Sequence, residues 1–196
     1  ERVLIHDTKP SAAASFQRRV AGFASGLEIR VADSETVARQ ADVLCTVTSV
    51  EAGSGPVFQG TELREGLHVN AVGADFPGKF ELPQTLLERA FVCPDFPSQA
   101  LQEGESQRLA PESLGPDLIE LVKGRSQYQA KRRELTVFDS TGFALEDHVA
   151  LEVITNRLFD LGLVLDKEAD WQTKIWTIHG FGHWLGLDTH DVNDSK

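Results

Sequence analysis

The segment GLHVNAVGADFPGKFEL, residues 66–82, decides the fold of this chain. Its first half alternates apolar and polar residues, which is the pattern of a half-buried β-strand. The strand breaks at Gly73, and a carboxylate, Asp75, follows almost at once. A strand that ends in glycine and then presents an acid is typical of open α/β sheets, which bind ligands beyond the carboxyl ends of their strands.

Upstream and downstream of this segment, the first 165 residues alternate strand patterns with helix patterns. Such alternation predicts an α/β fold with a Rossmann-like, doubly wound parallel sheet. The predicted strands cover residues 2–7, 27–32, 42–48, 66–73, 90–94 and 135–140. The predicted helices begin at Pro10 and near residues 34, 83 and 116, with a long one after Gly142.

The amino-acid composition of the chain changes at Asp166. A charged spacer, DKEAD, leads into a tail that holds all three tryptophans and three of the six histidines. We therefore predict two domains: an α/β domain over residues 1–165 and a separate module over residues 166–196.

Composition narrows the class of protein. A formal net charge of −11 argues against nucleic acid as a partner, and 41% hydrophobic residues suffice for a core. No apolar run approaches the roughly 20 residues of a membrane span, and the N-terminus lacks a signal-peptide pattern, so we expect a cytoplasmic protein with no membrane partner. Cys45 and Cys93 lie in separate apolar runs and are expected to be reduced, buried thiols.

Several polar residues follow predicted strands. Asp75 is either a catalytic acid or base or the organiser of a turn. Asp7 is either a ligand of a nucleotide ribose or a helix cap. Thr46 and Thr48, at the end of the 42–48 strand, either border a bound dinucleotide or are ordinary buried strand threonines.

Three stretches together resemble the ornithine cyclodeaminase/mu-crystallin family: RVLIHDTKPSAAASF (2–16), HVNAVGADFPGKFEL (68–82) and TVFDSTGFALEDHVAL (136–151). The resemblance implies that NAD is the cofactor and that Asp75 is catalytic. It implies cofactor-binding roles for these residues: Asp7, Thr46, Thr48, Ser140, Thr141 and Gly142. A further segment, residues 98–109, is similar to a glycine-centred acidic motif of the family, but we expect an exposed acidic loop there.

For activity, the resemblance implies the conversion of L-ornithine to L-proline with release of ammonia. In that reaction NAD⁺ takes hydride from the α-carbon, the side-chain amine attacks that carbon with Asp75 as base, and the hydride is returned after ammonia leaves. An NAD(P)-dependent ketimine reductase, an alanine dehydrogenase-like enzyme and a non-catalytic crystallin-like protein are the alternatives. The aspartate at position 75 favours the cyclodeaminase.

The family's glycine-rich phosphate turn has no counterpart in this sequence, which contains no G-x-G-x-x-G or G-x-G-x-x-A. We therefore expect an incomplete sheet that lacks its first strand, and a truncated, inactive form without the half that makes the family homodimeric. In the strand order 3-2-1-4-5-6, the missing strand would lie between the strands at 2–7 and 42–48. We expect those two strands to pair directly, the alternative being a strand added by residues 174–180.

The tail contains HGFGHWLGLDTHDV, residues 179–192. This stretch resembles the histidine-rich segment of aminopeptidase P, a di-manganese enzyme, and His183 corresponds to one of its metal ligands. The carboxylate ligands of that family have no counterpart here. We therefore expect no metal site, with His183 as a weak candidate, and a metal-dependent Xaa-Pro aminopeptidase fragment is only a remote alternative.

Overall fold

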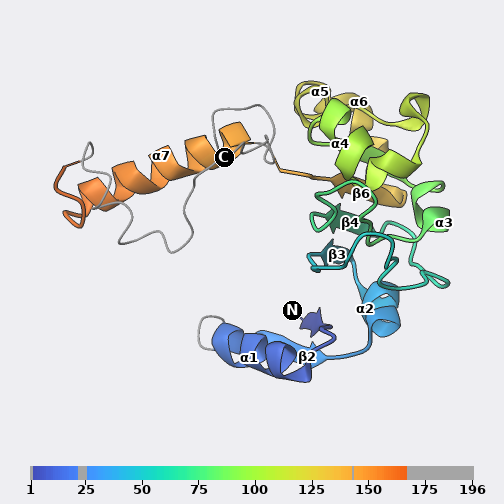
Figure 1. Ribbon diagram of the computed structural model, residues 1–196, viewed down its shortest axis with the longest axis horizontal. Coiled ribbons are helices and arrows are strands. Elements are labelled where there is room, and N and C mark those ends of the chain that lie inside the picture. The colour runs from blue at the N-terminus through green and yellow to red at the C-terminus, as the bar shows by residue number, and fades with distance from the viewer. Residues whose placement is uncertain (1, 22–25, 143, 167–196) are drawn as a thin grey trace, which may run out of the picture. The chain divides into compact units, whose positions relative to one another are not determined.

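The structure is a computed structural model that describes residues 2–21, 26–142 and 144–166. It divides into two compact units, residues 1–141 and residues 142–196 (Figure 1). The first unit holds all of the described strands, which form two parallel sheets, and the second contains one long helix. The predicted α/β class is therefore confirmed.

The smaller sheet is a βαβ unit. Strands β1 (Arg2–Ile5) and β2 (Glu28–Val31) pair in parallel, and helix α1 (Pro10–Ala21) connects them. Proline at the first position of α1 suits a helix start, where no backbone donor is needed. The side chain of Gln17 ties the helix to the sheet by donating to the carbonyl of Ile29 at 2.9 Å.

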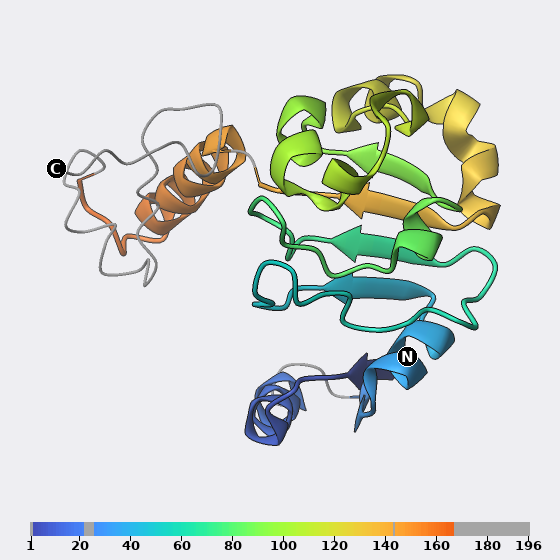
Figure 2. The ribbon, with the colours of Figure 1, turned by 45° about the vertical axis from the view of Figure 1, so that its right-hand side comes forward.

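The larger sheet has four parallel strands in the order β3-β4-β6-β5 (Figure 2). The strands are β3 (Val43–Thr46), β4 (His68–Ala71), β6 (Thr136–Asp139) and β5 (Phe91–Pro94). Their register places the last residues of all four strands in one row. The carboxyl ends therefore share one edge, which we call the C-terminal edge.

Helices and turns cover this sheet and complete its core. They are α2 (Ser34–Gln40), α3 (Gln84–Leu87), α4 (Pro97–Glu103), α5 (Leu118–Lys123), α6 (Arg125–Tyr128), and the 3₁₀ turns η1 (Glu105–Arg108), η2 (Pro111–Ser113) and η3 (Gln129–Arg133). Asp33 caps α2 by accepting from the backbone of Thr36 at 2.8 Å. The central strands contribute Val69, Ala71 and Val137 to the core, and all three are at most 1% exposed.

The order of the strands corrects one of our expectations. The strand β6, the last of the described strands in the sequence, lies between β4 and β5. Within the described residues, β1 pairs only with β2 and β3 only with β4, so the expected direct pairing of β1 with β3 is wrong. Among the described strands β3 is the edge strand of its sheet, and a strand of four residues presents few backbone groups at such an edge.

The second unit contains α7 (Ala144–Asp160), the predicted long helix. The predicted domain boundary at residue 166 adjoins residues outside the described ones, and it stays a prediction. The tail, including residues 174–180 and His183, also lies outside them. No helix in the described part of the chain is both long and apolar enough to cross a membrane.

Candidate functional site

The loop that follows β4 carries Asp75 at the C-terminal edge. We call residues 73–82 the Asp75 loop. The Asp75 carboxylate pairs with the ammonium of Lys79 at 2.7 Å, and the Lys79 side chain is only 15% exposed against 40% for Asp75. A partly exposed carboxylate can accept a proton from a ligand amine, and the contact with Lys79 fixes its position.

The strand ends around this loop are joined by backbone hydrogen bonds. Val72 donates to the carbonyl of Thr46 at 3.1 Å, and Ser140 donates to that of Ala71 at 2.9 Å. The ends of β3, β4 and β6 are therefore adjacent. Asp75, Thr48 and Ser140 all follow strands at this same edge, as a parallel sheet requires.

Thr48 is held by a buried glutamate of the Asp75 loop. Its backbone N–H and its hydroxyl both donate to Glu81 Oε1, each at 2.5 Å. Glu81 is fully buried, and its carboxylate packs so tightly against Gly73 that a side chain on Gly73 would collide with it. Glycine at position 73 is therefore required for Glu81 to reach Thr48.

The remaining predicted cofactor residues differ in their surroundings. The hydroxyls of Thr46 and Thr141 are buried and have no hydrogen-bond partner among the described residues. Ser140 Oγ instead donates to Asp95 at 2.8 Å. Gly142 has a φ of +87°, a left-handed conformation that glycine adopts without strain.

Asp7 has a local role in the structure. Its carboxylate accepts from the backbone N–H of Lys9 at 2.7 Å, directly before α1. This contact fits the capping interpretation, and the ribose-binding role remains a prediction. Among the described residues, no group of three or more His, Cys, Asp or Glu side chains could hold a metal ion.

Two buried acids, Asp139 and Glu105, form an acidic cluster next to Ser140, and our sequence analysis did not predict it. Asp139, at the end of β6, is fully buried and accepts from Ser106 N at 2.7 Å, Ser106 Oγ at 2.5 Å and Glu105 N at 3.0 Å. Gly104 approaches so closely that a Cβ there would lie 2.9 Å from the Asp139 oxygens. The expected exposed loop at residues 98–109 is wrong, because this segment forms α4 and η1 and buries its acid.

Glu105 extends the cluster to the Asp75 loop. Its Oε1 accepts from Glu81 N at 2.5 Å and from Leu82 N at 3.2 Å, and its Oε2 pairs with Arg108 at 2.5 Å. The sequence signal for it is the run Gly104-Glu105-Ser106, in which a residue without a side chain precedes an acid and a hydroxyl. Composition alone makes the run resemble a solvated loop.

Burial dominates the ionisation of both acids. It raises the pKa of Glu105 to about 7, although the Glu81 N–H and Arg108 favour the charged form. It raises the pKa of Asp139 to about 6 against the donors from Ser106 and Glu105. The Cys93 thiol is also buried, and its pKa rises to about 11, whereas Cys45 is exposed, contrary to our expectation.

These shifts predict that the chain loses stability as pH rises from about 4.5 to 7. A carboxyl whose pKa is raised on folding binds its proton more tightly in the folded state, so its contribution is full below the unfolded pKa and is lost as pH rises through the folded one. For Glu105 the loss is about 3 kcal/mol, since one pKa unit corresponds to about 1.4 kcal/mol. Urea unfolding at several pH values measures it.

The control for this titration is Glu112→Gln, which changes an exposed acid. Glu105→Gln lowers stability overall because it breaks the pair with Arg108, but it should flatten the pH dependence. Equal slopes for Glu105→Gln and the unchanged chain would contradict the assignment.

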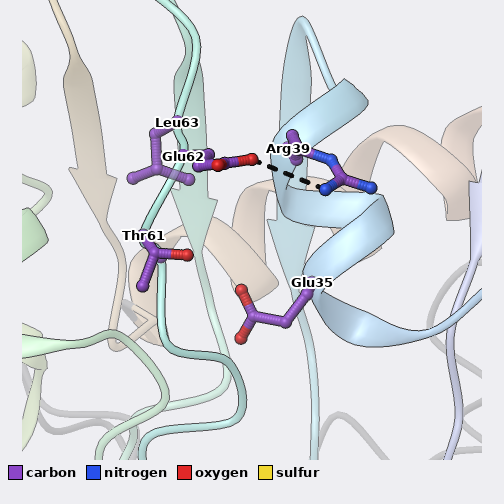
Figure 3. Close-up of a pocket in the computed structure, with 6 residues that line it drawn as sticks. Glu35, Arg39, Thr61, Glu62 and Leu63 are labelled. Carbon is purple, nitrogen blue, oxygen red and sulfur yellow. Dashed lines mark ion pairs between the residues drawn. The ribbon is translucent and has the colours of Figure 1, made fainter.

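A small cavity lies apart from the Asp75 loop. It is lined by Glu35 and Arg39 of α2 and by residues 60–63, and Arg39 pairs with Glu62 at 3.5 Å (Figure 3). Its volume of about 60 Å³ is well below the several hundred Å³ of a typical ligand pocket. It is not a candidate site for a dinucleotide.

Comparison with known proteins gives a consistent result. Residues 1–161 match the sequence model of the ornithine cyclodeaminase/mu-crystallin family. An L-lysine cyclodeaminase of Streptomyces rapamycinicus is 47% identical over 163 residues, covering 83% of this chain and 47% of the relative. An ornithine cyclodeaminase of Brucella suis is 35% identical over 173 residues, with 87% and 48% covered. The chain thus spans about half the length of the curated relatives it matches.

Solved structures agree with these matches. A lysine cyclodeaminase, whose structure concerns recognition of L-lysine, L-ornithine and L-2,4-diaminobutyric acid, superposes with a TM-score of 0.78 at 48% identity, covering 83% of this chain and 46% of that one. An archaeal alanine dehydrogenase dimer with bound NAD superposes with a TM-score of 0.71 at 29% identity, with 82% and 50% covered.

Proposed function

The chain belongs to the ornithine cyclodeaminase/mu-crystallin family, and from this premise we propose that it is the dinucleotide-binding part of a cyclodeaminase. Its substrate is an amino acid with a terminal amine, L-ornithine or its homologue L-lysine. The product is the corresponding cyclic secondary amino acid, which is L-proline for L-ornithine. The observation that carries the proposal is Asp75, presented at the C-terminal edge beside Lys79.

The residues present fit part of an NAD molecule. The buried hydroxyls of Thr46 and Thr141 lack hydrogen-bond partners among the described residues, and groups of this kind are satisfied when a polar ligand lies against the strand ends. Thr46, Thr48, Ser140, Thr141 and Gly142 would hold the nicotinamide side, and Asp7 a ribose. The glycine-rich turn for the pyrophosphate is not among residues 1–196.

In this proposal, bound NAD supplies reversible hydride transfer at the α-carbon of the amino acid. The chain's own contribution is the Asp75 carboxylate, which takes a proton from the terminal amine and so makes it nucleophilic. Lys79 holds that carboxylate in place through the contact at 2.7 Å. Ammonia is the one group lost, water is neither consumed nor released, and the net reaction is a deamination.

A second candidate is an NAD-dependent alanine dehydrogenase or ketimine reductase, favoured by the likeness to the archaeal alanine dehydrogenase. The two reactions differ in their use of cofactor. A dehydrogenase accumulates NADH in proportion to product, whereas a cyclodeaminase regenerates NAD⁺ in every cycle. Only the cyclodeaminase needs a base for a terminal amine, which is the role assigned to Asp75.

The proposal is tested by supplying the remaining half. We expect residues 1–196 alone to bind NAD weakly and to turn over no amino acid, because the pyrophosphate turn contributes several charge-assisted hydrogen bonds of roughly 1.5–3 kcal/mol each. A fusion of the N-terminal half of the Streptomyces rapamycinicus enzyme to residues 1–165 should bind NAD and release ammonia from L-ornithine or L-lysine. Calorimetry and an ammonia assay measure the two results.

Three outcomes would count against this assignment. Micromolar NAD affinity of residues 1–196 would show that the pyrophosphate turn is not needed. Stoichiometric NADH from L-alanine would favour the dehydrogenase. Binding of NAD by the fusion without ammonia release from either diamino acid would favour a non-catalytic, crystallin-like protein.

A further inference from the structure

We propose that Gln107 is a positioning residue. It fixes Gly78 and the backbone of Lys79, which we call the apex of the Asp75 loop, and thereby holds the Lys79 side chain against Asp75. The inference deepens the proposed function and rests on it, since Asp75 is the proposed base. Gln107 lies on η1, outside the loop itself, and no ligand role was expected for it from the sequence.

Both the oxygen and the nitrogen of the Gln107 side-chain amide contact the apex of the loop. Its Oε1 accepts from the backbone N–H of Gly78 at 2.7 Å. Its Nε2 donates to the carbonyl of Lys79 at 2.9 Å and to that of Gly104 at 2.8 Å. Only an amide can accept from an N–H at one end and donate to two carbonyls at the other. A carboxylate or an apolar side chain of the same size cannot do both.

The backbone held in this way sets the position of the Lys79 side chain. Gly78 has a φ of +80°, and Lys79 N donates to the carbonyl of Phe76 at 3.0 Å, so residues 76–79 form a tight turn. The turn brings Lys79 back to Asp75, four residues earlier, although the pair does not lie on a helix. A change at Gly78 and Lys79 would therefore move the ammonium away from the carboxylate.

Gln107 acts from a segment that is itself fixed to the sheet. Asp139, at the end of β6, binds the backbone of Glu105 and Ser106, the first two residues of η1. Arg108 donates to the carbonyl of Leu82 at 2.8 Å. Glu105 and Arg108 thus hold the last residues of the loop, while Gln107 holds its apex.

The division of roles makes Gln107 the informative residue to change. Glu105 is fully buried, so its replacement would disturb folding together with the loop. Gln107 is only partly buried, and its neighbours at the apex can be solvated when the contact is lost. Its replacement should loosen the apex while the sheet remains folded.

The test uses residues 1–196 with Gln107→Leu and Gln107→Glu, and Gln102→Leu as the matched control. Gln102 is an exposed glutamine of α4 whose amide donates to the neighbouring carbonyl of Ser98 at 2.9 Å. Two quantities are measured: hydrogen exchange of the Gly78 amide by NMR, and the rate at which Lys79 is acylated by acetic anhydride, read by mass spectrometry.

For Gln107→Leu we expect about a tenfold faster exchange of the Gly78 amide, the loss of about one hydrogen bond, and a several-fold faster acylation of Lys79. Gln107→Glu keeps an oxygen for Gly78, so it should retain most of the amide protection while still raising the Lys79 acylation rate. Gln102→Leu should change neither quantity, and the far-ultraviolet spectrum of all variants should match the unchanged chain.

Unchanged exchange at Gly78 in Gln107→Leu would overturn the contact, and unchanged acylation of Lys79 would overturn the positioning role. Equal acceleration at every lysine would also overturn it, because it would indicate general unfolding. Neither measurement involves an amino-acid substrate or NAD. A fusion that releases no ammonia would therefore count against the proposed function and would not alter the result for Gln107.

Discussion

Asp75→Asn should reduce ammonia release by the active fusion by two to four orders of magnitude while NAD remains bound. The amide of asparagine cannot take a proton from the substrate's terminal amine, and general-base catalysis typically contributes 10²–10⁴-fold. The substitution preserves the size of the side chain and one oxygen for Lys79, which lies 2.7 Å from the Asp75 carboxylate. Steady-state assays with calorimetry of NAD binding measure both effects.

The matched control is Asp42→Asn. Asp42 is 82% exposed, pairs with Arg64 and precedes β3, at the end of the sheet opposite to the Asp75 loop. We expect its replacement to leave turnover within a factor of two. Turnover of Asp75→Asn within threefold of the parent fusion would remove Asp75 from the chemistry, and loss of NAD binding would reassign it to the cofactor.

The sequence was sufficient to predict the elements that depend on local pattern. Alternating and continuous apolar runs marked every strand of the larger sheet, and the glycine break at residue 73 located the Asp75 loop. These features depend on side-chain period and on turn chemistry, which operate over a few residues. The strand order did not follow, because the position of β6 between β4 and β5 is a property of long-range pairing.

The acidic cluster could not be predicted from the local sequence pattern. A segment such as residues 98–109 has the composition of a solvated loop, and burial of Glu105 is unfavourable by itself. Its burial depends on partners 23 to 34 residues away in the sequence, namely Glu81, Leu82 and Asp139. Only the folded chain brings these groups together, so the pattern within the segment could not reveal them.

The last prediction concerns the same cluster: Asp139→Ala should destabilise the chain by about 3 kcal/mol, which lowers its Tm by roughly 6–12 °C. The substitution leaves three buried donors without an acceptor: Ser106 N, Ser106 Oγ and Glu105 N. An unsatisfied buried donor costs about 1–3 kcal/mol. Release of the buried charge offsets part of the sum, because burial already raises the Asp139 pKa to about 6.

Two comparisons separate this explanation from a simple loss of volume. Asp42→Ala removes the same number of atoms at an exposed position and should cost less than about 1 kcal/mol, as surface ion pairs do. Ser106→Ala combined with Asp139→Ala should be less destabilising than the sum of the two single changes, because the double variant has one orphaned donor fewer. Additive losses, or a loss below 1 kcal/mol for Asp139→Ala, would mean that the sheet does not depend on this carboxylate to hold η1, and that Gln107 acts from a segment fixed by other contacts.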